Sequence, residues 1–216
     1  MDLISIYNEI KKDIDEKFDT FAKTWSNGDG YIIEELLFSI CTPQSKAQSA
    51  AKAIKELSNQ DLIYHPNVDK IAIVLSESGV RFKNRKASYI MEALSRFNHR
   101  NISIKKFIYN NISVYGISET RNWLAKNVKG IGMKEASHFL RNIGYGEDLA
   151  ILDRHILRKL DEHAGIKQPK RLGKKEYLEI EEEMFNYSKE IGISMFDLDF
   201  VFWAETHKGE LFDRHE

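Results

Sequence analysis

Residues 127–142 read Asn-Val-Lys-Gly-Ile-Gly-Met-Lys-Glu-Ala-Ser-His-Phe-Leu-Arg-Asn, and this stretch decides the fold. Its centre, Gly130-Ile-Gly132, is typical of a tight hairpin, because glycine tolerates positive φ and close backbone approach. Apolar side chains then recur three and four positions apart, which predicts a helix from Met133 onward. N–H groups at the start of such a helix can bind a phosphate without any side chain. The same string also fits a plain glycine cap between two packed helices.

A second short stretch, Ile151-Leu-Asp-Arg-His-Ile-Leu157, follows further along the chain. Asp153 stands where a helix N-cap would stand, and as a cap alone it would contribute about 1 kcal/mol. Lys134, in the first turn of the helix after the hairpin, would in most proteins be an ordinary surface lysine. The hairpin, Lys134 and Asp153 are each ambiguous alone. Their combination is what indicates a function.

Together, the Val128–Lys134 and Ile151–Ile156 segments resemble the helix-hairpin-helix DNA glycosylase superfamily. Its members carry a hairpin, a lysine two residues after the second glycine, and a downstream aspartate. The fuller run from Lys129 to Arg158 is most similar to the type 2 (archaeal-type) 8-oxoguanine DNA glycosylase/AP lyases. Looser likenesses at Arg81–Ile90 and Leu198–Trp203 extend the resemblance over most of the chain.

The resemblance implies an all-α helix-hairpin-helix glycosylase fold with two helical lobes and an active site in the cleft between them. Residues 1–29 and 144–216 would form one lobe. Residues 30–143 would form a helical barrel with the helix-hairpin-helix at about 118–143.

The resemblance also implies a role for each site residue. Lys134 would be the nucleophile, buried in the cleft and beside neighbouring positive charge. Asp153 would stabilise positive charge on the sugar, whereas we expect His155 to be structural. Two further sets of residues would bind the DNA. Phe82 and Trp203 would hold the flipped base between their rings. The remaining DNA contacts would come from Gly130, Gly132, Gln44, Arg81, Arg85 and Lys129. From the sequence alone, Phe82 and Trp203 also fit ordinary core aromatics.

Composition agrees with a helical, non-membrane protein. Of 216 residues, 42% are apolar and 30% charged, and no apolar run approaches the ~18 residues of a membrane helix. Apolar positions recur at three and four almost throughout, which predicts about ten helices, with breaks at 25–30 and 144–148. The N-terminus lacks a signal-peptide pattern. We therefore expect a cytoplasmic protein that associates with the nucleoid when it acts.

The single cysteine, Cys41, excludes an internal disulfide and a four-cysteine iron–sulfur cluster. We expect no cofactor and see no metal-ligand pattern among the seven histidines. The resemblance still allows a structural cation held by hairpin carbonyls.

Charge is unevenly distributed although the net charge is only −1. Residues 177–199 contain seven acids and one base, whereas residues 81–106 contain one acid and eight bases: Arg81, Lys83, Arg85, Lys86, Arg96, Arg100, Lys105 and Lys106. Either run could be a solvated helix face. Beside the hairpin, however, the basic run predicts phosphate contacts, with the acidic run facing away.

The chain departs from the family pattern in two places. The Thr42-Pro-Gln-Ser45 loop differs from the commoner Thr-Ala-Asn form, and Gln44 would fill the gap that a flipped base leaves. The chain ends Lys208-Gly-Glu-Leu-Phe-Asp-Arg-His-Glu216 rather than on the family's terminal lysine, which bears on discrimination between 8-oxoguanine and guanine.

The function predicted from these residues is excision of 8-oxoguanine from double-stranded DNA through a lysine Schiff base, followed by β-elimination at the abasic site. We expect a monomer. Two alternatives remain: a related glycosylase for another damaged base, and a non-catalytic DNA-binding module. The module is disfavoured because pure binding needs neither Lys134 nor Asp153.

Overall fold

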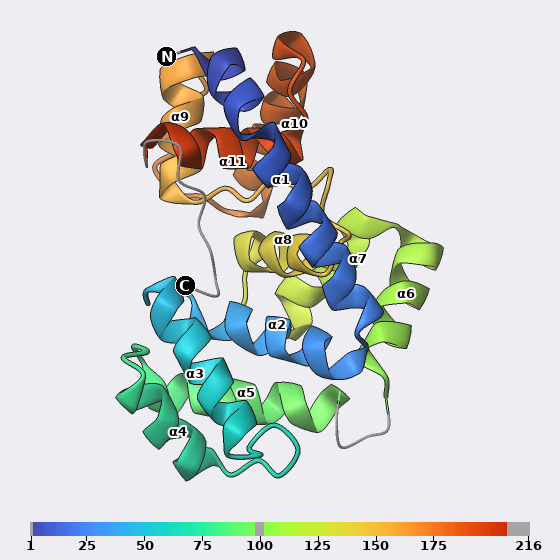
Figure 1. Cartoon of the computed structure of the whole chain (residues 1–216), viewed down its shortest axis with the longest axis vertical. Coiled ribbons are helices and arrows are strands. Elements are labelled where there is room, and N and C mark those ends of the chain that lie inside the picture. The colour runs from blue at the N-terminus through green and yellow to red at the C-terminus, as the bar shows by residue number, and fades with distance from the viewer. Residues whose placement is uncertain (1, 98–101, 207–216) are drawn as a thin grey trace. The chain divides into compact units, whose positions relative to one another are not determined.

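Eleven helices and no strand make up the secondary structure of residues 2–97 and 102–206, the part that this computed structural model describes (Figure 1). The helices are α1 (Leu3–Ser26), α2 (Asp29–Cys41), α3 (Ala47–Asn59), α4 (Val68–Glu77), α5 (Lys83–Phe97), α6 (Ile104–Tyr115), α7 (Ile117–Asn127), α8 (Met133–Asn142), α9 (Arg154–Ala164), α10 (Lys174–Ile191) and α11 (Met195–Thr206). The predicted all-α class is confirmed, as are the two breaks, which separate α1 from α2 and end α8.

The chain divides into two compact units. Among the described residues, the first unit contains residues 2–23 and 140–206, and the second contains residues 24–97 and 102–139. Both boundaries fall inside helices, α1 and α8, rather than in the glycine-rich breaks at 29/30 and 143/144 where we expected them. The glycines in these two breaks mark where α1 and α8 end. They do not determine which unit the last turns of these helices pack against.

The second unit is organised around α2. From Ile32 to Cys41 this helix is buried on nearly every side, with only Glu34 more than marginally accessible. A helix that is apolar all round must be covered on all sides, and α2 contacts α3, α5 and α6. Further contacts join α3 to α4, α4 to α5, and α6 to α7.

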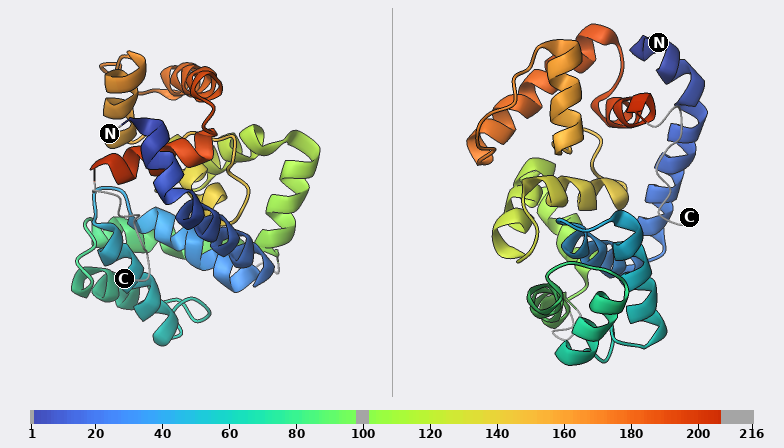
Figure 2. Two further views of the ribbon diagram at one scale, coloured as in Figure 1. Left: turned by 45° about the horizontal axis from the view of Figure 1, so that its top comes forward. Right: turned by 90° about the vertical axis from the view of Figure 1, so that its left-hand side faces the viewer.

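The first unit is organised around α11, which contacts α9 and α10 (Figures 1 and 2). Eight of its residues are buried, including Leu198, Val201 and Phe202. Gly165 and Gly192, both in the left-handed conformation, end α9 and α10, which is a common helix stop because glycine has no Cβ to clash there.

The acidic run 177–199 is not simply a solvated face. Asp197 is buried and accepts a hydrogen bond from the Tyr7 hydroxyl at 3.1 Å, and Asp199 forms an ion pair with Arg141. Glu181 accepts a backbone N–H at 2.8 Å. At least three of its seven acids therefore stabilise the first unit.

None of the described helices combines the length and the apolar character needed to cross a bilayer. Within the same residues, no three His, Cys, Asp or Glu side chains gather where a metal ion could be held.

Candidate active site and nucleic-acid interface

The hairpin between α7 and α8 spans residues 128–132, and its two glycines have different roles. Gly130 has φ +91°, and a Cβ there would lie 2.7 Å from Tyr89 Cδ2 and 3.3 Å from Ile40 Cγ2. Gly132 has no positive φ, and a Cβ there would meet only Glu135 Oε2 at 3.4 Å. Only Gly130 is therefore required by backbone conformation and by packing against α2 and α5.

Glu135 closes the mouth of the hairpin. Its Oε2 accepts the Gly132 N–H at 3.1 Å, so the Gly132 amide, which we expected to face a phosphate, is bonded to a carboxylate here. This is half of a capping box, in which an acid three residues inside a helix satisfies the N-cap amide.

Lys134 lies in the first turn of α8, with 27% of its side chain exposed. Its Nζ is 4.0 Å from Glu135 Oε1. A carboxylate therefore lies beside this amine, and the neighbouring positive charge that we expected stays a prediction. The side chain is partly accessible, as that of a nucleophile must be.

Asp153 is the N-cap of α9. Its Oδ1 accepts the backbone N–H groups of His155 at 2.8 Å and Ile156 at 2.9 Å. The Oδ2 atom has no hydrogen bond to any described residue. The cap therefore uses one carboxylate oxygen and leaves the other for a different role.

His155 links Asp153 to the predicted base-binding residue Trp203 within the first unit. Its Nε2 lies 2.9 Å from the Phe202 carbonyl oxygen, and its ring packs edge-on to Trp203 with 5.8 Å between ring centroids. Trp203 itself is half-buried. These contacts fit the structural role that we expected for His155.

Phe82, the other predicted base-binding residue, is not a core aromatic. It is 50% exposed, has φ +60°, and lies under the Arg81 guanidinium at 5.3 Å from the ring centroid. A positive φ at a bulky residue is a genuine outlier, and such strain is concentrated at functional sites.

Gln44 shares this unusual backbone, with φ +57° and an exposed side chain. Its loop is joined to the Phe82 turn through Ser45, whose Oγ accepts the Arg81 N–H at 3.0 Å. The structure therefore brings Gln44, Arg81 and Phe82 together in the second unit, although Gln44 and Phe82 are 38 positions apart in the sequence.

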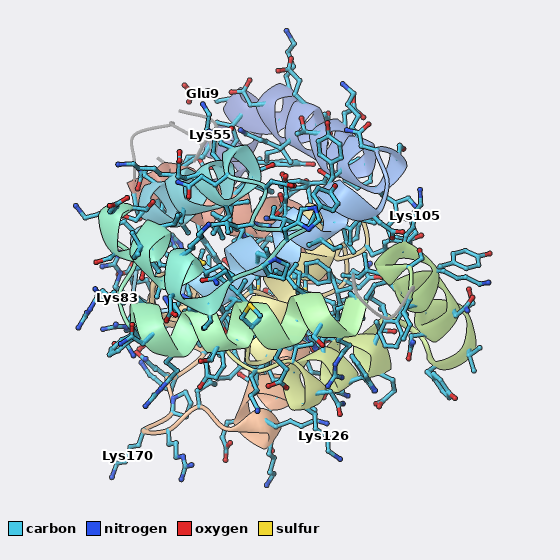
Figure 3. All side chains as sticks on the ribbon, turned by 90° about the horizontal axis from the view of Figure 1, so that it is seen from below. Glu9, Lys55, Lys83, Lys105, Lys126 and Lys170 are labelled. Carbon is cyan, nitrogen blue, oxygen red and sulfur yellow. The ribbon has the colours of Figure 1, made fainter. Side chains whose placement is uncertain are left out.

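The basic run 81–106 contributes fewer surface cations than we expected. Arg81 and Arg85 are exposed, and Lys83 and Lys105 lie at the periphery (Figure 3). Lys86, in contrast, is 4% exposed, so our expectation that it contacts phosphate was wrong. Position 86 lies four residues before the buried Ile90, and this spacing was a signal that the side chain faces inward. Arg100 lies outside the described residues.

The hairpin base residue Lys129 is exposed and forms an ion pair with Glu92, the single acid of the basic run, at 2.8 Å. Glu92 and Tyr89 both belong to α5, and Tyr89 packs on Gly130. Helix α5 therefore contributes two of the contacts that hold the hairpin.

Cys41 at the end of α2 is fully buried, and burial raises the pKa of its thiol to about 12. It is a core residue, as we expected. The C-terminal segment Lys208–Glu216, including the position of the missing family lysine, lies outside the described residues.

The all-α fold, with a hairpin between α7 and α8 and a lysine in the first turn of α8, is that of a helix-hairpin-helix protein. The family model for 8-oxoguanine DNA glycosylase matches residues 14–193. The chain belongs to this 8-oxoguanine DNA glycosylase family.

Relatives and solved structures agree with this assignment. The 8-oxoguanine DNA glycosylase/AP lyase of Fusobacterium nucleatum is 42% identical over 200 residues, covering 92% of this chain and 90% of that protein. Its Methanocaldococcus jannaschii counterpart is 35% identical over 197 residues, covering 91% and 90%. The crystal structure of the M. jannaschii enzyme bound to a 15-mer DNA containing 8-oxoguanine matches with a TM-score of 0.84 at 33% identity, covering 98% of this chain and 97% of that one.

Proposed function

We propose that this protein excises 8-oxoguanine from double-stranded DNA and then cleaves the strand at the abasic site. The observation that carries the proposal is the partly exposed side chain of Lys134 in the first turn of α8, directly after the Gly130 hairpin. The relatives from Fusobacterium nucleatum and Methanocaldococcus jannaschii, which align over about nine-tenths of their length, are named 8-oxoguanine DNA glycosylase/AP lyase, and this supports 8-oxoguanine as the substrate.

Lys134 would supply the amine for both steps. Its neutral amine attacks the sugar C1′, the N–C1′ bond forms, and the bond from C1′ to the base breaks, with a proton going to the departing base. The C1′–O4′ bond then breaks, O4′ takes up a proton, and the nitrogen loses its remaining proton as the C1′=N imine forms. The imine acidifies the C2′ proton, whose loss expels the 3′ phosphate by β-elimination. A lysine amine is suited to such Schiff-base chemistry, and this reaction requires no cofactor.

Asp153 would support base departure. A carboxylate placed where positive charge develops on the sugar lowers the barrier electrostatically. The Oδ2 atom, which the helix cap does not use, is available for this task.

Recognition of the base would fall to aromatic side chains. The half-exposed ring of Phe82 offers a face on which an extruded base could stack. Trp203 keeps the base-stacking role that the family resemblance implies. Gln44, exposed on its loop, would fill the gap in the duplex. Arg81, Arg85 and the hairpin would hold the phosphates, and we propose that a single copy of the chain suffices.

A strand-cleavage assay tests this function. A labelled duplex carrying 8-oxoguanine at one position should be cut without alkali treatment, and a duplex with guanine at that position should remain intact. Lys134→Gln should abolish the cut, whereas Lys126→Gln, a change of an exposed lysine at the end of α7 (Figure 3), should not. Cleavage that appears only after alkali would show a glycosylase without lyase activity, and no cleavage in either case would contradict the proposal.

A further inference from the structure

Lys86 is a charged residue inside the second unit. Its side chain emerges from the first turn of α5 and is almost completely buried. The Nζ donates to the Cys41 carbonyl at 2.6 Å, to the Pro43 carbonyl at 2.8 Å and to Ser45 Oγ at 3.1 Å. An ammonium group has three protons, so these three acceptors satisfy it fully.

The three acceptors enclose Gln44. They lie at the end of α2 and along the loop that follows, so the ammonium group holds this segment from Cys41 to Ser45 against α5. Gln44 is the residue within the segment that adopts φ +57°. A left-handed residue other than glycine persists only when its surroundings impose the conformation, and Lys86 supplies that constraint.

The same ammonium group is coupled to the Phe82 turn. Ser45 Oγ accepts from both Lys86 Nζ and the Arg81 N–H. The Phe82 carbonyl accepts the Lys86 backbone N–H at 3.0 Å, as the first bond of α5. Lys86 therefore touches both of the strained segments, one through its side chain and one through its backbone and Ser45.

We propose that Lys86 is a positioning residue that fixes Gln44 and Phe82 in the conformations with which they open the duplex and receive the base. The inference rests on the proposed function. It makes Lys86 a specificity element that contacts no DNA, in contrast to Arg81 and Arg85 beside it.

The chemistry favours lysine at this position. An apolar side chain would leave the Cys41 and Pro43 carbonyls without this donor, and a buried carbonyl without a partner is costly. The compact ammonium converges on three acceptors at the end of a long stem, whereas the planar guanidinium of arginine spreads its donors in a fixed fork.

Lys86→Met tests the inference because methionine keeps the length of the stem and removes all three donors. Lys55→Met, on the exposed side of α3, is the matched control (Figure 3). Excision of 8-oxoguanine from a duplex and cleavage of a preformed abasic duplex are measured under single-turnover conditions, beside thermal melting. A preformed abasic site has no base to extrude or to stack.

We expect Lys86→Met to lower excision by roughly tenfold or more, in line with loss of base stacking, and abasic cleavage by less than about threefold. Lys55→Met should change neither. If Lys86→Met does not fold, Ser45→Ala, which removes only the shared acceptor, should show the same preference for loss of excision. Equal loss on both substrates, or no loss on either, would overturn the inference.

A mutant cycle distinguishes positioning from general packing. If Lys86 acts through Gln44 and Phe82, adding Lys86→Met to the Gln44→Ala/Phe82→Ala variant should lower excision by less than about twofold, because coupled residues are not additive. A further full tenfold loss would contradict the inference. If the wild-type chain excises 8-oxoguanine normally in these assays, such a result leaves the proposed function intact.

Discussion

At Phe82, a role in base recognition can be distinguished from a role in stabilising the core. Its sequence context allowed either a core aromatic or a base-stacking residue, and its half-exposed ring at positive φ excludes the core. No local pattern could reveal this, because the φ value depends on the Ser45 and Lys86 contacts, which come from a different part of the chain.

We predict that Phe82→Ala lowers 8-oxoguanine excision by roughly tenfold to a hundredfold, since a stacked base contributes ~1–3 kcal/mol. Cleavage of a preformed abasic site should be largely spared, and Trp203→Ala should behave in the same way. Melting of Phe82→Ala should change little, whereas truncation of a core Phe costs ~3–5 kcal/mol. A large fall in melting temperature with equal loss of both activities would remove Phe82 from the base site.

Asp153 allows the capping and chemical roles of one carboxylate to be separated. Asparagine caps a helix about as well as aspartate, so Asp153→Asn should keep the melting temperature near that of wild type. The loss of negative charge should lower the rate of base excision by orders of magnitude. Asn67→Ala, which removes the N-cap of α4, should cost about 1 kcal/mol of stability without a specific rate defect. An Asp153→Asn enzyme with a normal excision rate would leave Asp153 as a cap alone.

Among the helices and turns, α5 connects the predicted DNA-facing segments of the second unit. Lys86, Tyr89 and Glu92 follow one another at intervals of three along this helix, which places them on neighbouring turns. They contact the Gln44 loop, Gly130 and Lys129, respectively. Helix α5 itself was predictable from the three- and four-residue spacing of its apolar side chains. Its contacts were not predictable, because they join residues that lie up to 45 positions apart in sequence.

The hairpin predicts a contrast between its two glycines. Gly130→Ala should destabilise the protein by roughly 1–2 kcal/mol for the left-handed backbone alone, and more because its Cβ would lie 2.7 Å from Tyr89. The displaced hairpin should also bind duplex DNA more weakly. Gly132→Ala has no such constraint and should melt within a few degrees of wild type. Thermal melting and duplex titration measure both effects, and equal tolerance of the two changes would contradict the packing described for Gly130.

For the chain as a whole, the division into two units places Lys134 in one and Asp153 in the other. The two-lobed organisation was predictable only through resemblance to a family, since each unit draws helices from distant parts of the sequence. The boundaries inside α1 and α8 could not be inferred from the glycines, which report where a helix ends and not which unit it joins.

Binding to undamaged duplex should weaken steeply with salt. Each phosphate neutralised by a cation contributes about −0.9 to the slope of log K against log[salt]. Arg85→Ala should therefore make the slope shallower by about one, whereas Lys55→Ala, on α3 outside the basic run, should leave it unchanged. A slope near zero for the wild-type chain would contradict the nucleic-acid interface.

Borohydride trapping tests the central claim most directly, because reduction turns a lysine–sugar imine into a permanent bond. The chain is incubated with an 8-oxoguanine duplex and borohydride, and the adduct is digested and mapped by mass spectrometry. We predict an adduct on Lys134, its loss in Lys134→Gln with duplex binding retained, and normal trapping in Lys126→Gln. An adduct on Lys129, or no adduct from a chain that still binds and cuts the duplex, would contradict the account.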